Sequence, residues 1–255
     1  SAKVALFSAG SSSPDLTGKS QYFFRNYPSD ASQGSVLAEL AFNKQGMKKV
    51  AFIQEQQDYA LGIYNAFNAK FTSLGGTIIK EEFPKDATDF RSQLTKLRGE
   101  NPDALFIDPQ TAAATQRILK QLQDLQWKPK IFINDVSVSD VETVTTFKDV
   151  LEGAFGAEFG LSDNEKSQKL VSAYKAKFQK EVPYPTYGQT EYDAVYMGRD
   201  AIKEVGYNGE KIAEWGHKVT NWQGASGSVT IDSNGDRVGG HSPKVIKNGK
   251  VEVYQ

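Results

Sequence analysis

The loop at residues 9–18 has the composition of a ligand-binding loop. It contains Gly10, Ser12 and further small hydroxyl residues, and it follows an apolar run at Val4–Phe7 that we expect to form a buried strand. Open α/β sheets bind ligands at the ends of such strands, where small residues let backbone N–H groups come close and hydroxyl groups add hydrogen bonds. An ordinary connection between a strand and a turn favours the same residue types.

Asp135 is a second candidate for ligand contact. It lies just beyond a short apolar run centred on Phe132, and ligands of α/β sheets bind at the carboxyl ends of strands. Two structural alternatives remain open at this point: Asp135 is either an exposed loop acid or the cap of a helix over 136–141.

Several kinds of catalytic and metal chemistry find no support in the sequence. The chain has no cysteine and two histidines, His217 and His241, which argues against thiolate nucleophiles, histidine triads and multi-histidine metal sites. The acidic segment 232–236 does not fit a calcium loop, because Arg237 occupies the position that needs glycine. No phosphate-binding glycine motif follows a strand. We therefore expect no cofactor and no metal, and a binding protein rather than an enzyme.

The composition is that of an ordinary globular protein. The 255 residues are 39% hydrophobic and 24% charged, with a formal net charge of −1. The lysines are scattered among acids and form no basic stripe, so we expect no nucleic acid partner. No apolar run approaches the length that crosses a bilayer. The chain is long enough for one large domain or two smaller ones.

The middle of the chain alternates between expected strands and helices. Apolar runs are centred on Val50, Ile78, Leu105 and Phe132, and they recur every 27 or 28 residues. This is the spacing of successive βα units in a parallel sheet. Segments with helical periodicity separate the runs, so the sequence predicts an α/β fold.

The pattern changes after residue 156. We expect two helices at about 165–179 and 189–205 with no strand between them, so these helices need another surface to cover. Short β segments follow from Ser228, and Asn248–Gly249 indicates a hairpin with a type I′ turn. The chain is therefore expected to pass repeatedly between two lobes: residues 1–30 with 160–228, and residues 31–159 with 229–255.

In the order and spacing of its motifs, the whole chain resembles the type I periplasmic binding proteins, in particular the leucine/isoleucine/valine-binding branch that serves ABC importers. Each motif is weak by itself, and their order along the chain makes the resemblance specific. The motifs are Ser13–Thr17, Phe24–Arg25, Pro28–Asp30, Gln33–Gly34, Asp58–Gly62, Thr88–Phe90, Asn101–Ala104, Tyr192–Val195 and Asn234–Arg237.

The resemblance implies a fold and a set of ligand contacts. In this family two α/β lobes with parallel sheets close on a small ligand about a hinge. Gly10 and Ser12 match positions that hold a ligand carboxylate, and Asp135 matches the acid that receives an α-ammonium group. Tyr59 and Tyr187 match aromatic contacts, although Tyr59 could instead shield a core edge and Tyr187 could instead pack its proline-rich loop.

Two departures from the family pattern qualify these implications. Gln110 and Thr111 match the loop that lines the side-chain pocket, where branched-chain binders tend to have aromatic residues, so we expect a more polar pocket. Thr111 could equally cap the next helix. Family members also carry about one domain's worth of chain before the strand at Val4–Phe7, so the first lobe is expected to be incomplete.

The resemblance implies an extracytoplasmic protein, periplasmic or extracellular, with its signal sequence outside this chain. It would deliver a small amino acid or related carboxylate to an ABC permease. The alternative is an interaction module that binds no solute, because an incomplete first lobe would expose a sheet edge and favour self-association or a complementing chain.

Overall fold

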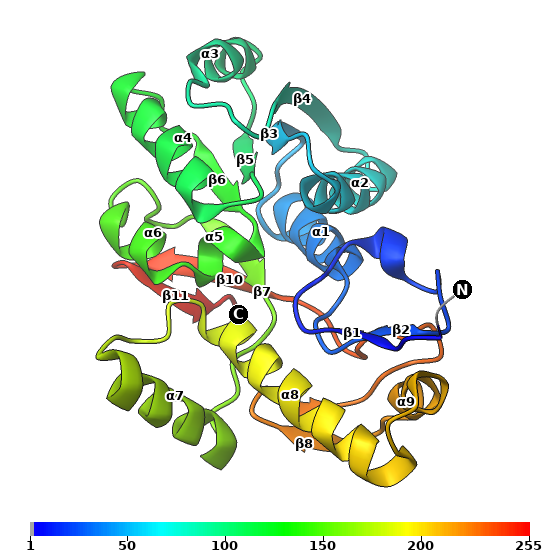
Figure 1. Ribbon diagram of the computed structural model, residues 1–255. Helices are drawn as coiled ribbons and strands as arrows, with labels where there is room; N and C mark the ends of the chain where they lie inside the picture. The colour runs from blue at the N-terminus through cyan, green and yellow to red at the C-terminus, as the bar shows by residue number, and fades with distance from the viewer. Residues whose placement is uncertain (1–2) are drawn as a thin grey trace. The chain divides into compact units, whose positions relative to one another are not determined.

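The computed structural model describes residues 3–255 and divides into two compact units (Figure 1). Unit 1 comprises the chain up to Ser29 together with Phe159–Gly240. Unit 2 comprises Asp30–Glu158 and His241–Gln255. The chain therefore passes between the units at three places. Among the described helices, none has the length and apolarity needed to span a membrane.

A seven-stranded sheet forms the centre of unit 2. Its strand order is β11-β10-β7-β6-β5-β3-β4, in which β4, β3, β5, β6 and β7 run parallel and β10 and β11 are antiparallel additions. The strands are β3 (Lys49–Glu55), β4 (Thr77–Phe83), β5 (Ala104–Asp108), β6 (Lys130–Ile133), β7 (Phe155–Glu158), β10 (Ser242–Lys247) and β11 (Lys250–Val253). The chain goes from β3 to one neighbour and then to the other, so the strand order switches between β3 and β5. Ligands of such sheets bind at this point, beyond the carboxyl ends of the strands.

Helices cover both faces of this sheet (Figure 1). On one face the first two helices pack over stacked phenylalanines, Phe52 on Phe106 with ring centroids 4.4 Å apart. On the other face the remaining helices pack over isoleucines such as Ile107. The helices are α1 (Asp30–Glu39, continued by a π-helical turn at Leu40–Lys44), α2 (Asp58–Ser73), α3 (Arg91–Gly99), α4 (Ala112–Asp124), α5 (Asp135–Ser139) and α6 (Val141–Thr146).

The α/β fold expected from the sequence is confirmed in this unit. The four apolar runs are the parallel strands β3 to β6. Strands β3, β5 and β6 are buried on both faces and consist of nearly continuous apolar residues, whereas the edge strand β4 is only partly buried. The Asn248–Gly249 hairpin is confirmed as well. Both residues have positive φ, 51° and 71°, as a type I′ turn requires, and they join β10 to β11.

Gly34 allows α1 and α2 to pack closely. A Cβ atom at this position would lie 2.5 Å from the Ile63 carbonyl oxygen and 2.7 Å from the Phe67 nitrogen. These are backbone atoms that cannot rotate away. We therefore expect Gly34→Ala to lower the free energy of unfolding by about 1–3 kcal/mol, the usual cost of overpacking.

Urea denaturation of the full chain would measure this loss, with Gly198→Ala as the matched control. Gly198 is inside helix α8 and a Cβ there has no neighbour within 4 Å. The control is expected to gain about 0.5–1 kcal/mol, since alanine favours a helix over glycine. Equal stability of Gly34→Ala and the wild type would show that the two helices do not approach this closely.

Unit 1 combines two small sheets with three helices. A parallel pair, β1 (Leu6–Ser8) and β2 (Phe23–Arg25), is separated by a 3₁₀ turn at Pro14–Leu16, and a second pair is antiparallel. Helix α8 contacts β1, as expected for a helix that needs a sheet to cover, whereas α7 packs on α8 and α9 contacts β2. The other elements are α7 (Glu165–Phe178), α8 (Pro185–Val205), α9 (Gly209–Gly216), β8 (Trp222–Gly224) and β9 (Gly227–Val229).

Unit 1 differs from the sequence-based expectation in several places. The first apolar run is not a buried strand, because Val4 and Leu6 are about two-thirds exposed, at 65% and 62%. Helix α8 begins at Pro185 rather than near 189, since proline suits the first turn of a helix. Helix α9 was not predicted.

The expected domain limits also differ from the units at residues 229–240. The sequence assigns this segment to the second lobe, whereas it packs in unit 1. Val229 and Ile231 are buried against Phe24 and Met197, and the Asp236 carboxylate forms an ion pair with Arg25. These contacts join positions far apart in the chain, so no local sequence pattern predicts them.

Candidate functional site

In unit 2 the structure brings Tyr59 and Asp135 together. Asp135 is the first residue of α5, at the carboxyl edge of the sheet, and Tyr59 is in the first turn of α2. The Tyr59 hydroxyl donates a short hydrogen bond to Asp135 Oδ1. Asn134, and not Asp135, caps α5, because its Oδ1 accepts from the Ser137 backbone N–H at 3.1 Å.

Gln33 fixes the position of Asp135 from helix α1. Its Nε2 donates to Asp135 Oδ1 at 2.9 Å, and its Oε1 accepts from the Asp135 backbone N–H at 2.8 Å. Both residues are fully buried. The carboxylate is therefore held by groups from two other helices, α1 and α2, in one orientation.

Asp30 and His241 complete a cluster around Asp135 that sequence reasoning missed. Each of the three residues offers one side-chain oxygen or nitrogen, and these atoms all lie within 4.8 Å of one another. His241 Nε2 is 3.7 Å from Asp135 Oδ2, and His241 Nδ1 is 2.7 Å from the Ser32 hydroxyl. The three residues are far apart in sequence. The one pattern that could have indicated them is that each lies at or next to the start of a helix or strand.

Asp108 is buried beneath this cluster, at the point where the strand order switches. It ends β5 and is the register partner of Gln54 in β3. Asp108 Oδ1 accepts from Asn134 Nδ2 at 3.0 Å. Among the described residues, neither Asp108 Oδ2 nor Gln54 Oε1 has a hydrogen-bond partner. Burial raises the pKa of Asp108 well above its ordinary value of 3.8; the hydrogen bond from Asn134 opposes this, and the nearby charges of Asp30 and Asp135 add to it.

We expect Asp108→Asn to stabilise the protein at neutral pH. Unfolded Asp108 loses its proton near pH 4, whereas the native side chain retains it to higher pH. In that window the native state binds more protons, so the Asp108 contribution to stability falls as pH rises. Asparagine removes this loss, and its amide can donate to Gln54 Oε1. The expected gain at pH 7 is about 1–3 kcal/mol, the cost of an unsatisfied buried polar group.

Urea denaturation at pH 4 and pH 7 would test this, with EDTA present throughout. The gain should be present at pH 7 and small at pH 4, where native Asp108 is protonated and the unfolded side chain is close to half protonated. Asp86→Asn, at an exposed position, is the control and should change little at either pH. A loss of stability in Asp108→Asn at pH 7 would contradict the role of burial.

In unit 1, Arg25 anchors the predicted ligand loop by hydrogen bonds to its backbone. The Arg25 guanidinium is fully buried, and its Nη1 donates to the carbonyl oxygens of Ser11 and Ser13 at 3.0 and 2.9 Å. Its Nε donates to Asp236 Oδ1 at 2.7 Å. Within the loop, the Gly10 and Ser11 backbone N–H groups donate to the Ser8 hydroxyl. The loop therefore has a fixed conformation with Ser12 buried between the two anchored carbonyls.

Tyr187 lies beside this loop. A Cβ atom on Gly10 would be 3.6 Å from the Tyr187 ring, so the two predicted site residues are neighbours. The Tyr187 ring stacks on the buried Tyr27, with centroids 4.7 Å apart and planes 12° apart. Tyr187 therefore both packs against Tyr27 and lies next to the loop.

Gln110 and Thr111 begin the segment after β5, and both are exposed. The Thr111 hydroxyl caps helix α4 by accepting from the Ala114 backbone N–H at 3.3 Å. The Gln110 backbone N–H donates to Glu55 Oε2 at 2.8 Å. The capping alternative for Thr111 is therefore confirmed, and pocket lining by either side chain stays a prediction.

The acidic segment 232–236 forms a turn that has a structural role. Asp232 Oδ1 accepts from the backbone N–H groups of Asn234 and Asp236, and Gly235 has a φ of 85°. Asp236 is engaged by Arg25 and by the Thr17 hydroxyl. Its carboxylate therefore serves these two partners, as expected for a turn rather than a calcium loop.

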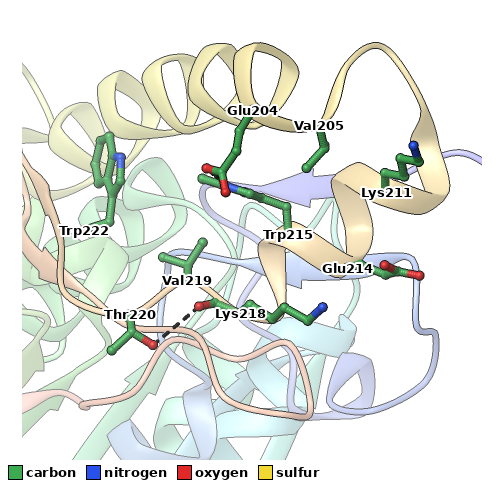
Figure 2. A pocket seen from close by; sticks show the side chains of 9 residues that line it. All are labelled: Glu204, Val205, Lys211, Glu214, Trp215, Lys218, Val219, Thr220 and Trp222. Atoms are coloured by element: carbon green, nitrogen blue, oxygen red, sulfur yellow. Dashed lines mark hydrogen bonds between the residues drawn. The ribbon is translucent and has the colours of Figure 1, made fainter.

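A pocket of about 490 Å³ lies on another part of unit 1 (Figure 2). It lies between the end of α8, helix α9 and the segment that follows, and its lining includes none of the predicted site residues. The Trp215 indole N–H donates to Glu204 Oε2 at 2.8 Å across it. The lining residues are Glu204, Val205, Lys211, Glu214, Trp215, Lys218, Val219, Thr220 and Trp222.

At each of the three places where the chain passes between the units, a residue of unit 2 is linked to helix α5, either directly or through Gln33. Asp30, at the first, is joined to Asp135 through Gln33, whose Nε2 also donates to Asp30 Oδ1 at 3.3 Å. Glu158, at the second, accepts from the Ser139 hydroxyl at 2.6 Å. His241, at the third, faces Asp135 directly.

Comparison with known proteins identifies the family. The profile for periplasmic binding proteins matches residues 1–242. The chain belongs to the periplasmic binding protein family. It is 31% identical to the leucine binding protein LivK of Thermotoga maritima, with a TM-score of 0.88 over 99% of this chain and 73% of that one. Both the recognition made from sequence motifs and the type I fold are therefore confirmed.

Two further relatives bear on the binding role of this family member. An amino acid binding protein of Pseudomonas aeruginosa is 26% identical over 92% of this chain. The substrate-binding protein LivJ of Streptococcus pneumoniae, solved with isoleucine, is 25% identical over 98% of this chain and 72% of its own, with a TM-score of 0.83. The chain spans 63% of the length of the Pseudomonas protein. These relatives are named for binding, in agreement with the expectation of a binding protein rather than an enzyme.

Proposed function

We propose that this chain is part of an extracytoplasmic substrate-binding protein that captures a small amino acid or a related carboxylate for an ABC permease. The observation that carries the proposal is the buried Asp135 carboxylate, oriented by Tyr59 and Gln33 at the carboxyl edge of the sheet. An oriented carboxylate in a dry setting suits an ammonium group, because a charged hydrogen bond is strongest where water is excluded. A periplasmic or extracellular location follows from the same proposal.

The ligand carboxylate is proposed to bind the loop that contains Gly10 and Ser12. Arg25 holds the carbonyl oxygens on both sides of Ser12, which fixes the loop before a ligand arrives. A loop fixed in advance loses little conformational freedom on binding. Tyr187, beside Gly10, would contact the ligand, and the polar residues Gln110 and Thr111 favour a ligand smaller or more polar than leucine.

The proposed mechanism is capture without chemical change. As the resemblance to this family implies, the ligand would bind a closed arrangement of the protein more tightly than an open one. Only this difference in affinity can favour closure. The permease would then recognise the closed form.

Isothermal titration calorimetry of the full chain, in buffer with EDTA, would test the proposal. The panel contains alanine, serine, threonine, glutamine and leucine, together with the N-acetyl form of each and benzoate. We expect one of the free amino acids to bind with 1:1 stoichiometry and its N-acetyl form, which has no ammonium charge, to bind at least 100-fold more weakly. No heat with any ligand, or tighter binding of N-acetyl forms, would contradict the proposal.

A further inference from the structure

The cluster of Asp30, Asp135 and His241 in unit 2 contains an imidazole besides its two carboxylates. A neutral imidazole nitrogen can accept a hydrogen bond from an ammonium group, whereas a protonated imidazole repels it. An imidazole nitrogen beside two carboxylates is also a donor set suited to a divalent transition metal ion. All three side chains are buried.

The spacing of the donor atoms fits one metal ion. Zinc lies about 2.0–2.1 Å from a histidine nitrogen and about 2.0–2.2 Å from a carboxylate oxygen, so two ligand atoms of tetrahedral zinc are about 3.3–3.6 Å apart. His241 Nε2 and Asp135 Oδ2 are 3.7 Å apart. The full set of three atoms lies within 4.8 Å, so the widest pair closes by up to about 1.4 Å when a metal ion binds.

The surroundings hold the three side chains as metal ligands are commonly held. His241 Nδ1 is 2.7 Å from the Ser32 hydroxyl, so the other ring nitrogen, Nε2, is the one that faces the carboxylates. A metal-binding histidine usually has its second nitrogen engaged in this way. The Gln33 amide bridges Asp30 and Asp135, at 3.3 and 2.9 Å, and sets the separation of the two carboxylates.

Asp108 supplies an independent observation that points to a cation. Its Oδ2 is buried and, among the described residues, has no hydrogen-bond partner. The charges of Asp30, Asp135 and Glu55 act on it and raise its pKa, and all four side chains are buried. Burying like charges is costly without compensation. A dication next to Asp30 and Asp135 would offset this charge without occupying Asp108.

We propose that Asp30, Asp135 and His241 form a binding site for a divalent transition metal ion, with zinc as the probe. The site is contained in unit 2 and is distinct from the predicted carboxylate loop in unit 1. The structural alternative is that protonated His241 serves as the counter-ion of Asp135 and no metal binds.

Zinc binding to the full chain, first stripped with EDTA and then exchanged into chelator-free buffer, would test the proposal. We expect the wild type to retain one zinc per chain after gel filtration, measured by elemental analysis. His241→Gln and Asp30→Asn should each weaken binding at least tenfold in a calorimetric titration with zinc chloride. His217→Gln removes the other histidine of the chain, which lies in unit 1, and should bind zinc as the wild type does.

A measurement on the wild type covers the case in which a variant fails to fold. With two histidines in the chain, nitrogen NMR can follow both side chains during a zinc titration. We expect the His241 Nε2 signal to move and the His217 signals to stay. Absence of zinc from the wild type, equal binding by His241→Gln, or an unmoved His241 signal would overturn the proposal. The amino-acid titrations contain EDTA, so either proposal can fail without the other.

Discussion

Replacing Arg25 with alanine is expected to lower the free energy of unfolding by about 3–5 kcal/mol, the cost of breaking a buried ion pair from one side. The Arg25 side chain is fully buried and donates to four acceptors: Asp236 Oδ1, the carbonyl oxygens of Ser11 and Ser13, and the Thr17 hydroxyl. Alanine leaves the Asp236 carboxylate, 13% exposed, without its charged partner and removes a donor from the Ser11 and Ser13 carbonyl groups, of which Ser13 keeps the Leu16 N–H.

Urea denaturation followed by tryptophan fluorescence suits this measurement, because Trp215 and Trp222 lie in unit 1 with Arg25. The matched control is Arg199→Ala. Arg199 also pairs with an aspartate, Asp200 at 2.7 Å, but it is half exposed, so its loss should cost less than about 1 kcal/mol. Similar stabilities of the two variants would show that Arg25 is not the anchor of the loop.

Asp135→Asn is expected to weaken binding of an α-amino acid at least 100-fold, or about 3 kcal/mol, while the fold is retained. Asparagine keeps the shape of the side chain and an oxygen that accepts from Gln33 and Tyr59. It removes the negative charge that would meet the ligand ammonium group. Affinity for an N-acetyl amino acid should change little, since that ligand has no charge for Asp135 to meet.

Calorimetry with the amino acid found in the panel would measure this effect in EDTA. Glu142→Gln is the control, because it removes one negative charge from an exposed position in the next helix. It should bind as the wild type does. Wild-type affinity in Asp135→Asn would exclude the proposed ammonium contact.

The parts of the fold that could be predicted from the sequence are those encoded by neighbouring residues. The apolar runs at Val50 and Leu105 predict buried parallel strands, because strands with both faces covered consist of apolar residues. Asn248–Gly249 predicts a type I′ turn, because few other residue pairs adopt positive φ twice in succession. Tyr59 and Asp135 follow the same logic: each comes shortly after a strand, so both reach the same edge of the sheet.

The rest depends on contacts between distant positions. Asp236 lies in a turn whose composition says nothing about Arg25, more than two hundred residues earlier, although their ion pair keeps 229–240 in unit 1. His241 gives no sequence signal that it will face Asp135. The sequence also does not predict that Asn134 rather than Asp135 caps α5, because asparagine and aspartate both cap helices well.

The attachment of all three chain connections to one short helix has a thermodynamic consequence. Asp30, Glu158 and His241 are the last residues of unit 2 at each connection, and each is linked to α5. A change in the charge on Asp135 therefore acts on Asp30 through Gln33 and on His241 directly, and it reaches Glu158 only through helix α5. Because coupling free energy is reciprocal, whatever perturbs these connections must in turn alter the affinity of this carboxylate for its ligand by the same factor.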